Sequence, residues 1–285
     1  MSKKITGLAL AGALALSLAA CGTAPASGTA SAPASGSTAA SAAMKTLVVG
    51  ATVAPHAEIL EAAKPLLAAE GIELVIKEFD DYVLPNTALD EGELDANYFQ
   101  HQPYLDLFNE KNGTELISAG SIHYEPLGIY PGKSSELKSA KGLTIAVPND
   151  GSNEARALYL LEAQGLVTID HAAGYEATPL DIPADGNPNG IKFVEMDADK
   201  LPSAVPDVDF AVINGNYAIA SGINETVLVT EDAKGESAQT YANIIAVRKG
   251  DEAREEIKAL VRVLQGDEIK KFIDEKYKGS VVALR

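Results

Sequence analysis

The chain contains no tryptophan, one cysteine and four histidines among its 285 residues, and aromatic residues make up only 6% of it. A single cysteine excludes an intrachain disulfide and a zinc site built from several cysteines. Cations are also scarce, because 23 Lys and Arg stand against 40 Asp and Glu, for a formal net charge of −17 at pH 7. Such a chain repels nucleic acid on average, so we expect no nucleic-acid partner.

Catalytic sequence motifs are absent as well. The chain has no Gly-x-Ser-x-Gly nucleophile turn, no phosphate-binding loop, no dinucleotide fingerprint and no His-Glu-x-x-His pair. Hydrophobic residues nevertheless make up 46% of the chain, enough for a substantial core in one large domain or two moderate ones. The absent motifs lower the expectation of catalysis, so we expect a folded protein with no enzyme activity and no cofactor.

The first 21 residues have the layout of a lipoprotein signal peptide. Lys3 and Lys4 give a positive start, and residues 5–20 are uncharged and rich in Leu and Ala. Small residues precede Cys21, as in a bacterial lipobox, where the thiol accepts a diacylglycerol. The alternative is an ordinary signal peptide, but the only cysteine stands where lipidation needs it. Since two or more acyl chains anchor a protein stably, we expect it on the extracytoplasmic face of the cell membrane.

A tether follows the signal peptide. Residues 22–43 contain only Gly, Ala, Ser, Thr and Pro, without charge or bulky apolar side chains. Such a segment buries too little surface to fold. Random-coil scaling gives it an end-to-end span of about 25 Å.

Strand-like and helix-like segments alternate from residue 45 onward. We expect strands at residues 46–51, 73–79, 94–97, 115–119, 143–148, 191–196, 208–213 and 241–247. We expect helices at residues 56–70, 81–91, 103–111, 153–164, 252–265 and 267–276. Repeated βαβ units predict parallel sheets covered by helices, and two runs of them predict two α/β lobes. Ligands of such folds bind at the carboxyl ends of strands, often between lobes.

Residues 95–104 are the most informative stretch, because they gather three aromatic side chains and His101 in an otherwise aromatic-poor chain. We expect a strand-to-helix turn there, close to Tyr82. Aromatic walls suit a polarizable group such as a thioether. Core filling by Phe99 and Tyr104 is the alternative, but the clustering favours a pocket.

Three further stretches place polar side chains after strands. In residues 147–156, Asn153 and Arg156 fall on one helix face, where Arg can clamp a carboxylate with two parallel hydrogen bonds. A solvated surface role for Arg156 is equally compatible with the pattern. Asn214 follows an apolar strand, and Asn243 lies at the edge of another, so each contacts either a ligand or a structural partner.

Together these stretches resemble the methionine-binding lipoproteins of ABC importers, the NlpA/MetQ lipoprotein family. The resemblance spans nearly all of residues 45–285. Its most specific marks are DYVLPN at 81–86, DANYFQH at 95–101, VPND at 147–150 and AVIN at 211–214.

The resemblance implies a type II periplasmic solute-binding fold, with two α/β lobes and a ligand cleft between them. The chain of such a fold crosses between the lobes twice, here near residues 125–128 and near Asn243. Lobe 1 then comprises residues 45–126 plus 243–285, and lobe 2 comprises residues 127–242.

The resemblance also implies eight binding residues. The family's ligand side chain is surrounded by the residues that match Tyr82, Phe99, His101 and Tyr104. The polar contacts to the amino-acid head group match Asn153, Asn214 and Asn243. Arg156 matches the residue that holds the α-carboxylate, whereas Asn149 and Tyr241 are weaker candidates.

The expected function is that of a monomeric receptor that delivers methionine to an ABC permease and its ATPase. Residues 123–130 differ from the crossing of some family members, so L-methionine, D-methionine and short methionine peptides all stay open as ligands. One alternative is a metal-capturing lipoprotein, which needs His101 together with His56 or His123. An amino-acid hydrolase and an adhesion or signalling lipoprotein are the others.

Overall fold

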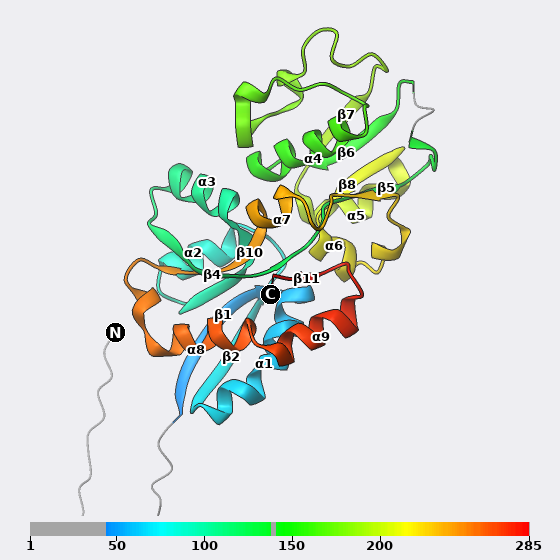
Figure 1. Cartoon of the computed structure of the whole chain (residues 1–285). Coiled ribbons are helices and arrows are strands. Elements are labelled where there is room, and N and C mark those ends of the chain that lie inside the picture. The colour runs from blue at the N-terminus through cyan, green and yellow to red at the C-terminus, as the bar shows by residue number, and fades with distance from the viewer. Residues whose placement is uncertain (1–43, 138–140, 285) are drawn as a thin grey trace, which may run out of the picture. The chain divides into compact units, whose positions relative to one another are not determined.

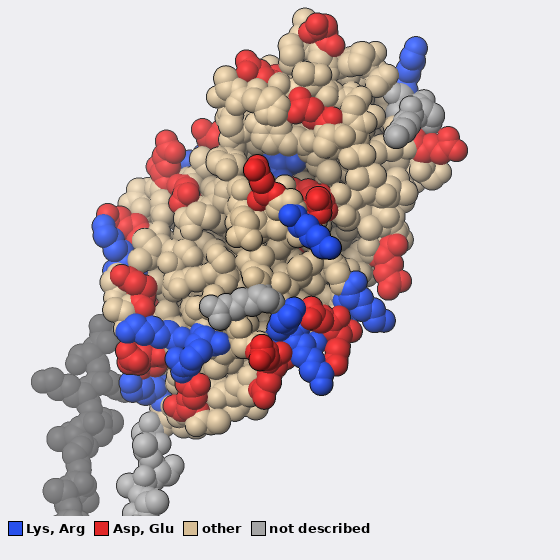
Figure 2. Space-filling view, in the orientation of Figure 1, with Lys and Arg blue, Asp and Glu red and all other residues tan. Residues whose placement is uncertain are grey.

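The computed structural model describes residues 44–137 and 141–284, which belong to one compact unit (Figure 1). The predicted signal peptide, the tether and Cys21 lie outside the described residues. No helix within the described ranges is both long enough and apolar enough to cross a membrane. Acidic and basic side chains alternate over the face shown in Figure 2, with no single large patch of either sign.

Six strands form the first sheet, in the order β11-β4-β10-β3-β1-β2. They are β1 (Lys45–Thr52), β2 (Ile72–Phe79), β3 (Ala96–His101), β4 (Leu116–Tyr124), β10 (Ala242–Arg248) and β11 (Val282–Ala283). β1 pairs in parallel with β2 and β3, whereas β10 is antiparallel to β3 and β4. The expectation of parallel sheets is therefore wrong in part, because β10 enters between β3 and β4 from the opposite direction.

Helices cover both faces of the first sheet. They are α1 (Glu58–Ala69), α8 (Glu255–Leu264) and α9 (Asp267–Tyr277) on one face, and α2 (Leu84–Asp90) and α3 (Gln102–Asn112) on the other. The alternation along β10 shows this division, since successive side chains of a strand point to opposite faces. Ile245 and Val247 share a core with α1, α8 and α9, while Ile244 and Ala246 share one with α2 and α3.

Five strands form the second sheet, in the order β7-β6-β8-β5-β9. They are β5 (Gly128–Pro131), β6 (Thr144–Pro148), β7 (Lys192–Met196), β8 (Phe210–Ile213) and β9 (Val229–Thr230). β6 is parallel to β7 and β8, and β5 is antiparallel to β8 and β9. Ile145 and Val147 of β6 pack with α4 (Gly151–Ala163), and Ala146 packs on the other face with α5 (Leu201–Ala204) and α6 (Gly215–Ala220).

The chain passes between the two sheets twice. It leaves β4 at Tyr124 and enters β5 at Gly128, and it leaves β9 at Thr230 and enters β10 at Ala242, after the short helix α7 (Glu236–Thr240). We call residues 125–127 and 231–241 the crossing segments. The first sheet therefore combines an early part and a late part of the chain, as Figure 1 shows by its blue and orange-to-red ribbons.

β3 corrects the predicted turn, because the strand continues through His101 and all six of its residues are buried. Its polar members form hydrogen bonds that no periodicity reveals. Asn97 Nδ2 donates to Asn86 Oδ1 at 2.8 Å, and Asn86 Nδ2 donates to Gln100 Oε1 at 2.9 Å. The predicted strand at residues 94–97 thus ends four residues too early, and the added residues belong to an interior strand whose amides satisfy one another.

Candidate functional site

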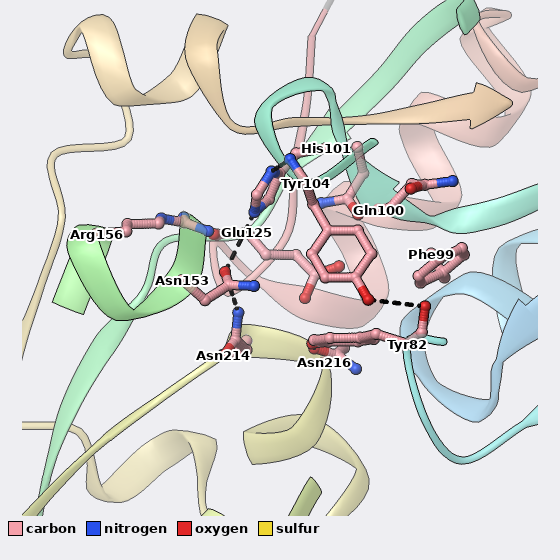
Figure 3. A pocket seen from close by; sticks show the side chains of 12 residues that line it. Tyr82, Phe99, Gln100, His101, Tyr104, Glu125, Asn153, Arg156, Asn214 and Asn216 are labelled. Carbon is pink, nitrogen blue, oxygen red and sulfur yellow. Dashed lines mark hydrogen bonds between the residues drawn. The ribbon is translucent and has the colours of Figure 1, made fainter. Parts of the chain in front are cut away.

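A small cavity lies between the two sheets, and its walls include all eight binding residues expected from the sequence (Figure 3). The lining consists of Tyr82, Phe99, Gln100, His101, Tyr104, Glu125, Asn153, Arg156, Asn214, Gly215, Asn216 and Asn243. Its free volume is about 20 Å³, which is room for about one water molecule. Figure 3 shows Arg156 and Asn153 on one side and Phe99 and Tyr82 on the other, so the cavity has a polar and an aromatic end.

Aromatic rings form one end of the cavity. The ring centroids of Tyr82, Phe99 and Tyr104 lie 5.7–6.0 Å apart in each pair. Tyr104 donates its hydroxyl to the carbonyl of Tyr82 at 3.0 Å, which ties α3 to the segment before α2. Tyr217 of α6 adds a fourth ring, 5.0 Å from that of Tyr82. Tyr217 is not itself part of the cavity lining, so it supports the aromatic end from the side of the second sheet.

His101 stands at the start of α3, between the aromatic and the polar end. Its Nδ1 accepts the backbone N–H of Tyr104 at 3.3 Å, which places the ring proton on Nε2. Nε2 then donates to Asn153 Oδ1 at 3.2 Å. Burial and the nearby charge of Arg156 lower the pKa of His101 to about 3, so the ring is neutral at physiological pH.

Three asparagines furnish amide groups at the polar end. Asn153 is held by Asp150, the N-cap of α4, through a bond of 2.8 Å from Nδ2. Asn214 Nδ2 donates to Asn153 Oδ1 at 2.8 Å, whereas Asn214 Oδ1 is buried and has no hydrogen-bond partner among the described residues. Asn243 Oδ1 accepts from His56 Nε2 at 3.0 Å. The orphaned acceptor of Asn214 is energetically unfavourable unless a donor completes it.

Arg156 is buried, which rules out the solvated surface role. Its guanidinium pairs with Glu231, with Nε 2.9 Å from Oε1 and Nη2 2.5 Å from Oε2. Burial disfavours both charges, but their mutual attraction outweighs it, raising the pKa of Arg156 and lowering that of Glu231. The Nε edge is therefore taken by Glu231, and the expected two-bond clamp on a carboxylate cannot use that edge.

Glu125 was not expected in the cavity from the sequence, yet it lies in its wall. Its Oε1 is 2.7 Å from His123 Nε2 and 3.3 Å from His56 Nε2. Burial lowers the pKa of His56 to about 4 and that of His123 to about 3, and it raises the pKa of Glu125.

His56, His123 and Glu125 form the one group of candidate metal ligands among the described residues. The metal-capture alternative required His101 as a ligand, but His101 is bonded to Asn153 and Tyr104 instead. His123 Nε2 is already hydrogen-bonded to Glu125 Oε1 at 2.7 Å, and His56 Nε2 is hydrogen-bonded to Asn243 Oδ1 at 3.0 Å.

The two weaker candidates lie outside the cavity lining. Asn149 Nδ2 donates to Asp197 Oδ1 at 3.0 Å. The guanidinium of Arg156 lies over the ring of Tyr241, 4.3 Å from the ring centroid. Besides Glu125, the sequence reasoning did not single out Gln100, Gly215 and Asn216. Asn216 follows β8 within two residues of Asn214, so its place at a strand end was an available signal.

Comparisons with known proteins agree with this architecture. The model of the NlpA lipoprotein family matches residues 47–284. The chain is 41% identical over 245 residues to the methionine-binding lipoprotein MetQ of Bacillus subtilis, covering 84% of this chain and 88% of that protein. The structure is similar to that of a nutrient-binding protein from Burkholderia cenocepacia bound to methionine, with 42% identity, a TM-score of 0.79 and coverage of 84% and 100%.

A periplasmic substrate-binding protein of an ABC transporter from Coxiella burnetii is similar too, with 37% identity, a TM-score of 0.76 and coverage of 83% and 99%. The predicted solute-binding α/β fold is thereby confirmed.

Proposed function

This chain belongs to the NlpA lipoprotein family, and we propose that it captures methionine or a methionine derivative for import by an ABC transporter. The observation that carries the proposal is the composition of the cavity. One end offers a charged guanidinium and an orphaned amide oxygen, and the other offers aromatic rings. An amino acid with a thioether side chain presents the matching groups in the same order.

Each part of the ligand then has a named partner. Arg156 Nη1, which takes part in none of the hydrogen bonds among the described residues, receives the α-carboxylate. Asn214 Oδ1 accepts from the ammonium group, which removes its unsatisfied state. The rings of Tyr82, Phe99 and Tyr104 surround the thioether, where each sulfur–aromatic contact contributes roughly 0.3–1.5 kcal/mol. No bond of the ligand is broken in this role.

Entry of the ligand requires the walls to separate, because the free volume is far smaller than an amino acid. The two sheets with their helices act as two lobes, residues 45–126 plus 243–285 and residues 127–242. They open and close about the crossing segments, as two-lobed receptors do. The closed, loaded form then docks on the permease.

Calorimetry on protein that has been unfolded and refolded to strip its ligand tests the proposal. We expect binding heat with L-methionine, D-methionine or Gly-Met, and no heat with any of the three contradicts it. Arg156→Lys retains a positive charge opposite Glu231 but lacks the planar guanidinium, so affinity should fall about tenfold or more. Arg262→Lys, at an exposed surface pair with Glu70, is the matched control.

The membrane attachment is part of the same proposal. Cys21 carries the lipid, palmitate among its acyl chains, and residues 22–43 let a monomeric receptor reach both the solution and the permease. Cys21→Ala should abolish labelling by radioactive palmitate and release the protein from the membrane fraction. A Cys21→Ala protein that still takes up the label contradicts the assignment.

A further inference from the structure

The carboxylate of Glu231 collects hydrogen bonds from three parts of the chain. It lies in the second crossing segment, directly after β9, and its side chain is only 8% exposed. Oε2 accepts the hydroxyl of Tyr124 at 2.6 Å and the backbone N–H of Leu127 at 2.8 Å, besides the guanidinium of Arg156. Its own backbone N–H donates to the carbonyl of Leu127 at 3.0 Å. Glu231 thus joins the end of β4, both crossing segments and α4.

These contacts fix the guanidinium of Arg156 in one orientation. Nε and Nη2 donate to Glu231, and Nη2 also donates to the carbonyl of Glu125 at 2.9 Å. The ring of Tyr241 lies against the guanidinium face at 4.3 Å. With one edge and one face occupied, Nη1 is the part of the group left to meet a solute in the cavity.

Glu231 does not line the cavity, so it acts on a solute only through Arg156. Glu231 can affect carboxylate binding in two opposite ways, one through its charge and one through its hydrogen bonds. Its negative charge weakens the attraction of Arg156 for a carboxylate, so removing it tightens binding if charge alone decides. Its hydrogen bonds hold a long, flexible side chain in place, so removing them loosens binding if orientation decides.

We propose that Glu231 is a positioning residue that presents Arg156 Nη1 to the carboxylate of the bound amino acid and ties that contact to both crossing segments. The inference rests on the proposed function. Five hydrogen bonds to one buried carboxylate favour orientation over charge, because charge-assisted bonds of this kind are the strong ones in proteins. Glu231 therefore determines how well the site distinguishes a carboxylate from a neutral group.

The test compares L-methionine with L-methioninamide, whose neutral carboxamide replaces the carboxylate. Calorimetry gives both dissociation constants for the wild type, for Glu231→Gln and for the surface control Glu225→Gln. We expect Glu231→Gln to weaken L-methionine binding about tenfold and to change methioninamide binding less, so that the preference for the acid shrinks. Glu225→Gln should keep the wild-type ratio.

Tyr124→Phe gives a second measurement, because it removes one donor to Glu231 and leaves the ring beside Arg156 in place. It should shift the acid-to-amide preference in the same direction by a smaller factor, and it decides the question if Glu231→Gln does not fold. An unchanged ratio, or tighter methionine binding, in the folded variants overturns the inference while leaving the proposed function intact. A wild type that binds neither compound overturns both.

Discussion

Tyr82 donates its hydroxyl to Asn216 Oδ1 at 2.6 Å, and this bond connects the segment before α2 to α6 of the second sheet. Tyr217 makes a reciprocal connection, from its hydroxyl to the carbonyl of Asp80 at 3.0 Å. The two sides of the cavity are therefore joined directly at its aromatic end.

Tyr82→Phe should weaken methionine binding two- to tenfold, because the variant keeps the aromatic wall but loses one bond that closes it. The range corresponds to about 0.5–1.5 kcal/mol for a hydrogen bond. Calorimetry measures the change. Tyr159→Phe is the control, since it loses a comparable bond to Gly174 that lies within the second sheet's helices. Equal affinities of both variants would show that the Tyr82 bond does not stabilise the closed form.

Asn214→Ala should separate binding from folding. It removes the orphaned Oδ1 and the bond from Nδ2 to Asn153, so the ligand-free protein should keep its Tm within a few degrees. Methionine affinity should fall about tenfold or more, because the ligand's ammonium group loses its acceptor. Asn224→Ala, in the short 3₁₀ helix that follows α6, is the control. A large loss of Tm with unchanged affinity would contradict the assignment of Asn214 to the ligand.

Because His101 is neutral in the folded protein, we expect the free energy of unfolding to decrease as the pH falls. Its pKa in the folded protein is about 3, below the usual 6.5, so the unfolded chain binds more protons between those values. The stabilisation is complete above pH 6.5 and is lost as pH falls toward 3, by about 2 kcal/mol between pH 7.5 and pH 5. His56 and His123 act in the same direction, and Glu125 acts in the opposite one.

Urea unfolding at pH 7.5 and pH 5 measures this decline. His101→Gln should be less sensitive to pH than the wild type by that amount, because glutamine does not titrate. Parallel pH curves for His101→Gln and the wild type would show that folding does not lower the pKa of His101.

Gly132→Ala should destabilise the second sheet. An added Cβ would lie 2.3 Å from the carbonyl oxygen of Val208 and 2.4 Å from that of Val205, so backbone must move. Overpacking of this kind costs roughly 1–3 kcal/mol in the free energy of unfolding, or more. Gly151→Ala at the start of α4 is the control, since its nearest neighbour would be Leu107 Cδ1 at 3.4 Å. Urea unfolding should give Gly132→Ala a lower midpoint than Gly151→Ala. Equal midpoints would contradict the close approach of the Val205 and Val208 carbonyls to Gly132.

The sequence predicted those elements whose signal is local. The apolar run of β1 and the helical spacing of α1 are visible in a window of a few residues, and both elements are present. The end of β3 was missed because Gln100 is buried by its bonds to Asn86, which no local pattern encodes. Strand-end motifs drew attention to the stretches around the cavity, but the set of eight expected residues came from the family resemblance.

Glu231 was missed for the same reason. It stands in an ordinary polar stretch, and its importance arises only from the ion pair with Arg156, 75 residues earlier in the chain. The roles of the eight lining residues as ligand contacts stay predictions.

The first hydrophobic core unites Leu47 near the start of the described chain with Val281 near its end, together with both α8 and α9. A growing polypeptide therefore makes β1, β2 and β3 long before the ribosome supplies α8 and α9, two of the three helices that cover one face of their sheet. The strands of the second sheet, by contrast, come from one continuous stretch and are all synthesised before β10, α8 and α9. During synthesis the core that β1 shares with α8 and α9 therefore stays incomplete until almost the last residue.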